Sequence, residues 1–124
     1  MKPLTKTEEE IMKYLWKLEK CYMKELVEEF PDPKPAYTTI ATYLTRMTDK
    51  GLVGFHQRGK VREYYPKLKK GAYFKSHFNT MIKSFFNGSA SQFASFFTTK
   101  TDLSLTELEE LKKIIDQQID EKKK

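Results

Sequence analysis

The chain has 124 residues, of which 39% are hydrophobic and 14% aromatic, and this composition excludes wholesale disorder. Its single cysteine, Cys21, excludes an intrachain disulfide. No stretch approaches the roughly 20 apolar residues of a membrane span, and the first residues lack the apolar run of a signal peptide, so we predict a cytoplasmic protein. The net charge of +6 is uneven, with −2 in residues 1–32, +7 in residues 33–70 and +1 in residues 71–124.

The N-terminal part of the chain predicts two helices. Thr7 and Glu10 have the spacing of a capping box, and the apolar residues that follow recur at helical spacing, which predicts a helix over roughly residues 7–20. The same spacing recurs over residues 23–30 and predicts a second, short helix. Pro31 ends this helix because proline cannot continue one.

A third helix is predicted to begin at Pro35 and to end at Lys50, just before Gly51. One face carries an apolar stripe, and the other face carries small or hydroxylated side chains where an ordinary solvent face would have more Lys and Glu. Small polar side chains let a helix approach another surface closely. The apolar stripe consists of Ile40, Tyr43, Leu44 and Met47, and the polar face of Tyr37, Thr38, Ala41, Thr42, Thr45, Arg46 and Asp49.

The hydrophobic period then changes from that of a helix to that of strands. Residues 52–57 and 61–65 predict two strands joined by the tight turn 58–60, and Pro66 closes the second strand. Two strands alone are marginal, so this hairpin must pack on the helices. Three helices followed by a hairpin with a basic tip predict a mainly α fold, a winged helix-turn-helix over residues 1–70.

Residues 71–124 predict a helical arm with little net charge and many aromatic side chains. Ser104 and Glu107 form another capping box, which opens the last helix. An arm of this kind cannot bury its Phe side chains on itself, so we predict that it is a dimerisation arm that pairs with a second copy of the chain. The predicted interface residues are Phe78, Ile82, Phe85, Phe93, Phe97, Leu108, Leu111 and Ile115.

The basic segment and the polar face of the third helix predict an interface with double-stranded DNA. A helix fits the major groove, where base-edge contacts specify the sequence, while phosphate contacts position the protein. Thr methyls and Ala suit the thymine methyl, and Arg and Lys suit phosphates. The predicted DNA-binding residues are Tyr37, Thr38, Thr39, Ala41 and Thr42 for the reading helix, Arg46 and Lys50 further along it, and Arg58, Lys60 and Arg62 in the hairpin.

Three other functions are alternatives to DNA binding. A winged helix can be a protein–protein adaptor, and the Phe-rich arm can hold a small ligand, although aromatic stripes at helical spacing are more often core. Catalysis would need a nucleophile–base pair, a carboxylate pair or a phosphate loop, and none is evident, so we predict no enzyme. The spacing of Cys21, His56 and His77 suits no standard metal site, and we predict no metal and no cofactor. Cys21 itself suits a half-buried small residue better than a redox switch.

Several motifs in this order resemble the penicillinase-repressor family (BlaI, MecI and CopY). They are TEEEIMKYLW at residues 7–16, TIATYLTRM at residues 39–47 followed by Lys50-Gly51, and YYP at residues 64–66. They continue as FNGS at residues 86–89 and LSLTELEEL at residues 103–111. The resemblance implies a homodimeric transcriptional repressor that binds an inverted repeat in a promoter. It also implies relief by a membrane-bound sensor metalloprotease that cleaves the C-terminal arm.

The sequence departs from this family pattern at functional positions. The penicillin-responsive members are cut at an Asn–Phe bond, and the matching pair here is Ser95-Phe96, which puts both the cleavage and a β-lactam inducer in question. Ala41 stands where those members tend to carry a basic residue, so the operator sequence can differ. The cysteine cluster of the copper-responsive members is missing from this C-terminus.

Overall fold

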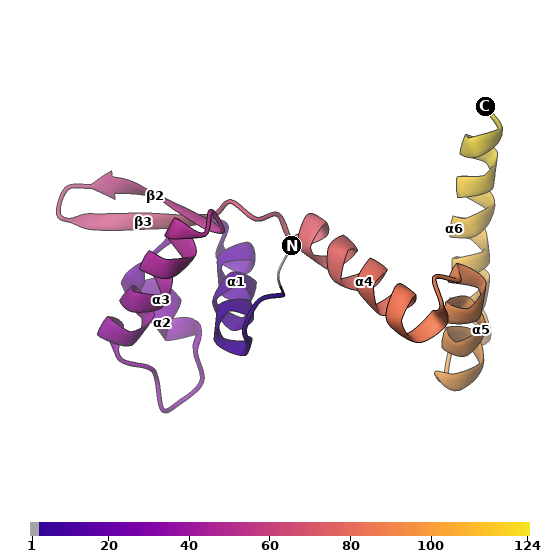
Figure 1. Ribbon diagram of the computed structural model, residues 1–124, viewed down its shortest axis with the longest axis horizontal. Coiled ribbons are helices and arrows are strands. Elements are labelled where there is room, and N and C mark those ends of the chain that lie inside the picture. Colours follow the sequence, from indigo (N-terminus) through magenta and orange to yellow (C-terminus); the bar gives the residue numbers. More distant parts are fainter. Residues whose placement is uncertain (1–2) are drawn as a thin grey trace. The chain divides into compact units, whose positions relative to one another are not determined.

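The computed structural model describes residues 3–124, which form six helices and a small sheet (Figure 1). The two residues before Pro3, which belong to the N-terminal stretch expected to lack a signal peptide, lie outside the described residues. The chain divides into two compact units after His77, inside α4, and the assignment of separate functions to residues 1–70 and 71–124 stays a prediction. The elements are α1 (Lys6–Leu18), β1 (Cys21–Tyr22), α2 (Met23–Glu29), α3 (Tyr37–Asp49), β2 (Val53–Arg58), β3 (Val61–Pro66), α4 (Lys70–Phe86), α5 (Ala90–Lys100) and α6 (Leu105–Lys123).

Helix α1 begins earlier than predicted, and the capping box expected at Thr7 is wrong. Thr5 is the N-cap: its hydroxyl accepts from the backbone N–H of Glu8 at 3.2 Å, and the Glu8 carboxylate accepts from the Thr5 N–H at 2.9 Å. Both pairs fit the spacing of a capping box, but Glu8 is 4% exposed and forms an ion pair with Lys50, the C-cap of α3. The capping box that forms, Thr5 with Glu8, is therefore the one whose glutamate also makes a long-range ion pair.

Helices α2 and α3 form the helix-turn-helix pair of the first unit. α3 begins at Tyr37 with Ala36 as its N-cap, so Pro35 lies before the helix and is not its first residue. The apolar stripes of α1, α2 and α3 converge on one core, as the helical spacing predicted. This core contains Ile11, Met12, Leu15, Cys21, Leu26, Val27, Phe30, Ile40, Leu44, Met47, Val53, Tyr64 and Leu68.

The sheet has three antiparallel strands in the order β1-β3-β2, which adds one strand to the predicted hairpin. The turn contains two residues, Gly59 and Lys60, because Arg58 pairs with Val61 at the end of the ladder. Gly59 has φ of 63°, a left-handed conformation that suits glycine in a tight hairpin turn. The structure thus confirms a winged helix-turn-helix with an additional edge strand, a fold in which the hairpin is anchored to the helices.

The second unit contains the end of α4 together with α5 and α6. The capping box of α6 is confirmed, since the Ser104 hydroxyl accepts from the Glu107 N–H at 3.1 Å and the Glu107 carboxylate accepts from the Ser104 N–H at 3.0 Å. Aromatic rings gather between the helices, with Phe93 at 5.0 Å from Phe78 and 5.6 Å from Phe86 between ring centroids. No residue of α4, α5 or α6 is buried. Within residues 3–124, no helix has the length and apolar character to cross a membrane.

Cys21 is expected to be unreactive in the folded protein. It is 1% exposed, and burial together with the charges of Glu25, Glu29 and Glu63 raises the pKa of its thiol to about 12. Because the thiolate is the nucleophile, iodoacetamide at pH 8 should leave the native protein unmodified and alkylate it in denaturant. Mass spectrometry of the two samples checks this, and rapid native labelling would contradict the buried placement.

Candidate nucleic-acid interface

Helix α3 has two chemically distinct faces. Ile40, Leu44 and Met47 are at most 1% exposed and hold the helix on the core. The opposite face is open to solvent, and Tyr37, its first residue, is 50% exposed. The other predicted contact residues on this helix are Thr38, Thr39, Thr42 and Arg46, which are exposed, Ala41, which is partly exposed, and Lys50 at its C-cap.

The hydroxyl groups on this face have defined orientations. The Thr42 hydroxyl donates to the carbonyl of Thr38 at 3.0 Å, and the Thr45 hydroxyl donates to the carbonyl of Ala41 at 3.0 Å. A threonine hydroxyl has one hydrogen to donate and two lone pairs that can accept. With its hydrogen engaged by the backbone, each hydroxyl offers acceptor lone pairs and the methyl group to an approaching surface.

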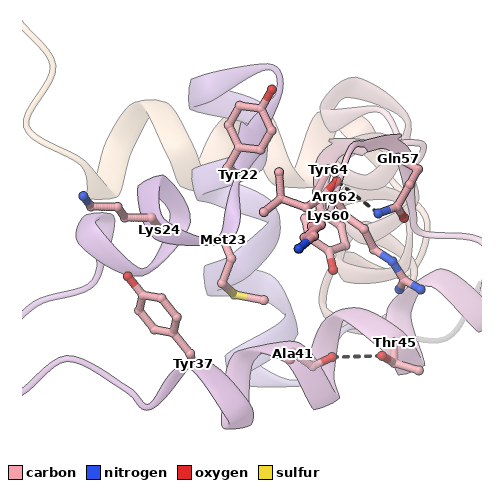
Figure 2. A pocket seen from close by; sticks show the side chains of 11 residues that line it. Tyr22, Met23, Lys24, Tyr37, Ala41, Thr45, Gln57, Lys60, Arg62 and Tyr64 are labelled. Atoms are coloured by element: carbon pink, nitrogen blue, oxygen red, sulfur yellow. Dashed lines mark hydrogen bonds between the residues drawn. The ribbon is translucent and has the colours of Figure 1, made fainter.

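A groove of about 630 Å³ separates α3 from the hairpin. Figure 2 shows Ala41 and Thr45 on the α3 side and Gln57, Arg62 and Tyr64 on the side of the hairpin. The groove brings together parts of the sequence that a linear pattern keeps separate. Its lining consists of Tyr22, Met23, Lys24, Tyr37, Ala41, Thr45, Gln57, Lys60, Val61, Arg62 and Tyr64.

Seven of these eleven lining residues are not among the predicted DNA-binding residues, and three of the seven, Tyr22, Met23 and Lys24, lie outside both α3 and the hairpin. They belong to β1 and to the start of α2 (Figure 2). A two-residue strand is too short for an alternating pattern, so nothing in the sequence placed it beside β3. The pairing of Cys21 with Tyr64 and of Tyr22 with Glu63 brings the segment to the edge of the groove. Lys24 consequently adds a cation to this interface.

The two arginines of the hairpin have different surroundings. Because side chains alternate along a strand and Gln57 pairs with Arg62, while Arg58 pairs with Val61, the two arginines point to opposite faces of the hairpin. The Arg62 guanidinium lies 4.1 Å from the ring centroid of Phe55 and lines the groove. The Arg58 Nε donates to the Glu63 carboxylate at 3.3 Å. The predicted basic tip is thus divided between two faces, with Lys60 in the turn.

Lys50 is tied to the other side of the domain. Its ammonium lies 2.7 Å from the Glu8 carboxylate, which joins the end of α3 to the start of α1. Burial raises the pKa of Glu8, but hydrogen bonds from Lys50 and Thr5 more than offset that effect and hold the pKa below its usual value. Glu8 is therefore ionised at neutral pH. The phosphate contact predicted for Lys50 stays a prediction, and it would compete with this ion pair.

The residues predicted for dimerisation carry apolar surface in the second unit. Phe85 is 77% exposed and Ile115 is 57% exposed, whereas the side chain of Phe93 is partly covered by other Phe rings. On α6, Ile114, Ile115 and Ile119 line an apolar hollow of about 370 Å³. The other predicted interface residues are Phe78, Ile82, Phe97 and Leu111, which are partly buried, and Leu108, which is 37% exposed.

The predicted cleavage site lies within α5. Ser95 and Phe96 are both exposed, Phe96 by 53%, and the Ser95 carbonyl accepts from the Thr99 hydroxyl at 2.6 Å. The bond between them is therefore part of a helical backbone. Among residues 3–124 there is no cluster of three or more His, Cys, Asp or Glu side chains that could hold a metal ion.

A winged helix-turn-helix with an exposed polar helix face beside a basic hairpin is typical of the nucleic-acid-binding class of proteins. The penicillinase repressor family model matches residues 4–117 of the chain. The protein therefore belongs to the penicillinase repressor family. Its members are transcriptional repressors that bind DNA, so the chain is a regulator and not an enzyme.

Curated relatives align over nearly the full length. A penicillinase repressor from Bacillus licheniformis is 27% identical over 121 residues, which are 97% of this chain and 94% of that protein. The methicillin resistance regulatory protein MecI of Staphylococcus aureus (strain N315) is 26% identical over 113 residues, 90% of this chain and 92% of that protein. A solved structure described as a CopR repressor is 20% identical, covers 55% of this chain and 100% of that chain, and has a TM-score of 0.46.

Proposed function

We propose that the protein is a homodimeric repressor that binds an inverted repeat in a promoter, with α3 in the major groove. The observation that carries this proposal is the exposed, small and hydroxylated face of α3, which adjoins the basic side of the hairpin across the groove of about 630 Å³. An α-helix fits the major groove, and short side chains allow its backbone to come close to the base edges. Family membership supports the same conclusion.

The groove is the proposed path of one sugar–phosphate strand. A protein that places a helix in the major groove and a hairpin beside the adjacent backbone must let the intervening strand pass between them. Lys24, Lys60 and Arg62 supply positive charge along this path, and the phenol of Tyr37 supplies a donor. These residues position the protein, whereas Thr38, Thr39, Ala41 and Thr42 read base edges. Arg46 binds phosphate further along α3.

The second unit is the proposed dimerisation unit. Its exposed Phe85 and Ile115 are apolar surface that a two-fold partner would remove from water. A two-fold dimer presents two copies of α3 to two half-sites, which lie about one helical turn or a multiple of it apart. This arrangement matches an inverted repeat, because the symmetry of the DNA site then equals that of the protein.

Replacing Arg58 and Arg62 together by alanine is expected to weaken binding to the DNA upstream of the protein's own gene by at least about tenfold. Each phosphate contact contributes about 0.9 to the slope of log affinity against log salt, so the loss of the Arg62 contact from both protomers of a dimer should flatten the slope by about two. Fluorescence anisotropy across a salt series measures both quantities. The matched control, Lys100→Ala with Lys113→Ala, removes the same charge from the second unit and should change the affinity little.

The alternative function, a protein–protein adaptor, makes the opposite prediction in this experiment. An apolar protein interface does not weaken steeply with salt, and an adaptor has no preference for promoter over random DNA. Weak binding without selectivity by the unmodified protein would favour the adaptor. An unchanged affinity in the double arginine variant would remove the hairpin from the DNA interface.

Relief by proteolysis within α5 is the proposed switch, with a membrane-bound sensor metalloprotease as its agent. Proteases bind extended chain, so the Ser95–Phe96 bond must leave its helix before it is cut, and local unfolding is inexpensive where no side chain is buried. Cells exposed to the inducer should accumulate a fragment that ends at Ser95. Mass spectrometry identifies that end, and Phe96→Asp should keep the chain intact and the promoter repressed. An intact wild-type chain after induction would show that relief takes another route.

A further inference from the structure

The hairpin carries one carboxylate among its basic side chains. Glu63 is the only acidic residue of β2 and β3, and its side chain is 12% exposed. The ladder pairs it with Tyr22 on one side and with His56 on the other. A negative charge in the hairpin repels the phosphates that the neighbouring basic side chains attract, so the presence of Glu63 needs an explanation.

The charge of Glu63 is directed at Arg58. The Arg58 Nε lies 3.3 Å from the Glu63 carboxylate, and the arginine side chain remains 54% exposed. The pair is therefore formed within the hairpin and is open on one side to a competing anion. A carboxylate and a phosphate group each present two oxygens that can accept from a guanidinium, so they compete for the same side chain.

Among residues 3–124 no carboxylate forms an ion pair with Arg62, whose guanidinium lies over the Phe55 ring. A cation above an aromatic ring keeps its full charge, because the ring attracts it through a quadrupole and does not neutralise it. The two arginines of the hairpin thus differ in how easily they can bind a phosphate. Arg62 is held in place and its charge is not neutralised, whereas the charge of Arg58 is offset by that of Glu63.

We propose that Glu63 competes with the DNA phosphates for Arg58 and thereby lowers the affinity of the hairpin for any DNA backbone. This inference rests on the proposed DNA-binding function and adds a specific attenuating residue to it. Binding to non-operator DNA is essentially electrostatic, and non-operator sites vastly outnumber operators. A carboxylate that weakens phosphate contacts therefore reduces the fraction of repressor that is held on bulk DNA.

The test is Glu63→Gln, which removes the charge and keeps an oxygen that accepts from the Arg58 Nε. We expect binding to operator and random DNA to strengthen by about three- to tenfold. The salt slope should steepen by about two, since each protomer of a dimer gains one phosphate contact of about 0.9. The matched control is Glu28→Gln, which makes the same charge change at an exposed residue of α2. Thermal melts confirm that both variants remain folded.

A double-mutant cycle assigns the effect to Arg58. In an Arg58→Ala background, Glu63→Gln should give no more gain than Glu28→Gln. A gain that persists without Arg58, a gain equal to that of the control, or weaker binding by Glu63→Gln would each overturn the proposal. If the unmodified protein shows no salt-dependent DNA binding, the proposed function itself fails, and that result is distinguished by the wild-type titration alone.

Discussion

Replacement of Leu111 and Ile115 by aspartate is expected to convert the proposed dimer into a monomer and to lower operator affinity by about two orders of magnitude or more. Both residues lie on α6, and the isoleucine is 57% exposed. A carboxylate on each side of a two-fold contact would be buried without a partner, which is costly. Once the two protomers separate, each α3 binds its half-site independently. The avidity of two linked reading helices, worth about 10² to 10⁴ in affinity, is then lost.

Sedimentation and operator binding check this prediction in parallel. The matched control is Lys113→Asp with Gln117→Asp, which adds two carboxylates to α6 outside the apolar hollow and should leave a dimer. A dimer that persists with Asp at both apolar positions would move the interface elsewhere in the second unit. A monomer that keeps wild-type operator affinity would separate DNA binding from dimerisation.

Leu44→Ala should cost about 2–5 kcal/mol of the free energy of unfolding, the second large effect expected. Leu44 is 0% exposed and lies where α3 packs on the core, so truncation loses buried apolar surface and leaves a cavity. The neighbouring Thr45→Ala should change the free energy of unfolding by less than about 0.5 kcal/mol, because this side chain is exposed and faces the groove.

Urea denaturation and DNA titration together distinguish the two faces of α3. We expect Leu44→Ala to shift the unfolding midpoint and, under conditions where it remains folded, to bind DNA with little change. We expect Thr45→Ala to unfold like the wild type and to bind the operator more weakly. Equal stability losses from both changes would contradict the orientation of the helix.

The sequence by itself determined the order of the N-terminal helices and the hairpin, and the two faces of α3. Helical spacing and proline stops are local signals, and they locate the three N-terminal helices without reference to any long-range contact. The same local logic identified the capping box at Ser104 and the hairpin that ends at Pro66. Motif order over nearly the whole chain also led to the family that the match over residues 4–117 then confirmed.

Only the tertiary structure decided which of two equivalent local signals was used and which side chains meet. Thr5 with Glu8 and Thr7 with Glu10 have the same spacing, and Glu8 alone reaches Lys50 from a buried position. The strand β1 has two residues and no periodic signal, so its pairing with β3, which brings Lys24 to the groove, became visible only in three dimensions.

The division of the hairpin's arginines has the same origin. Side chains alternate on a strand, so the face on which each arginine lies depends on the register, and the register depends on a turn of two residues rather than three. That one-residue difference places Arg62 over Phe55 in the groove and Arg58 beside Glu63 on the other face. Local patterns determine which elements form, and long-range pairing determines which charges are available to a ligand.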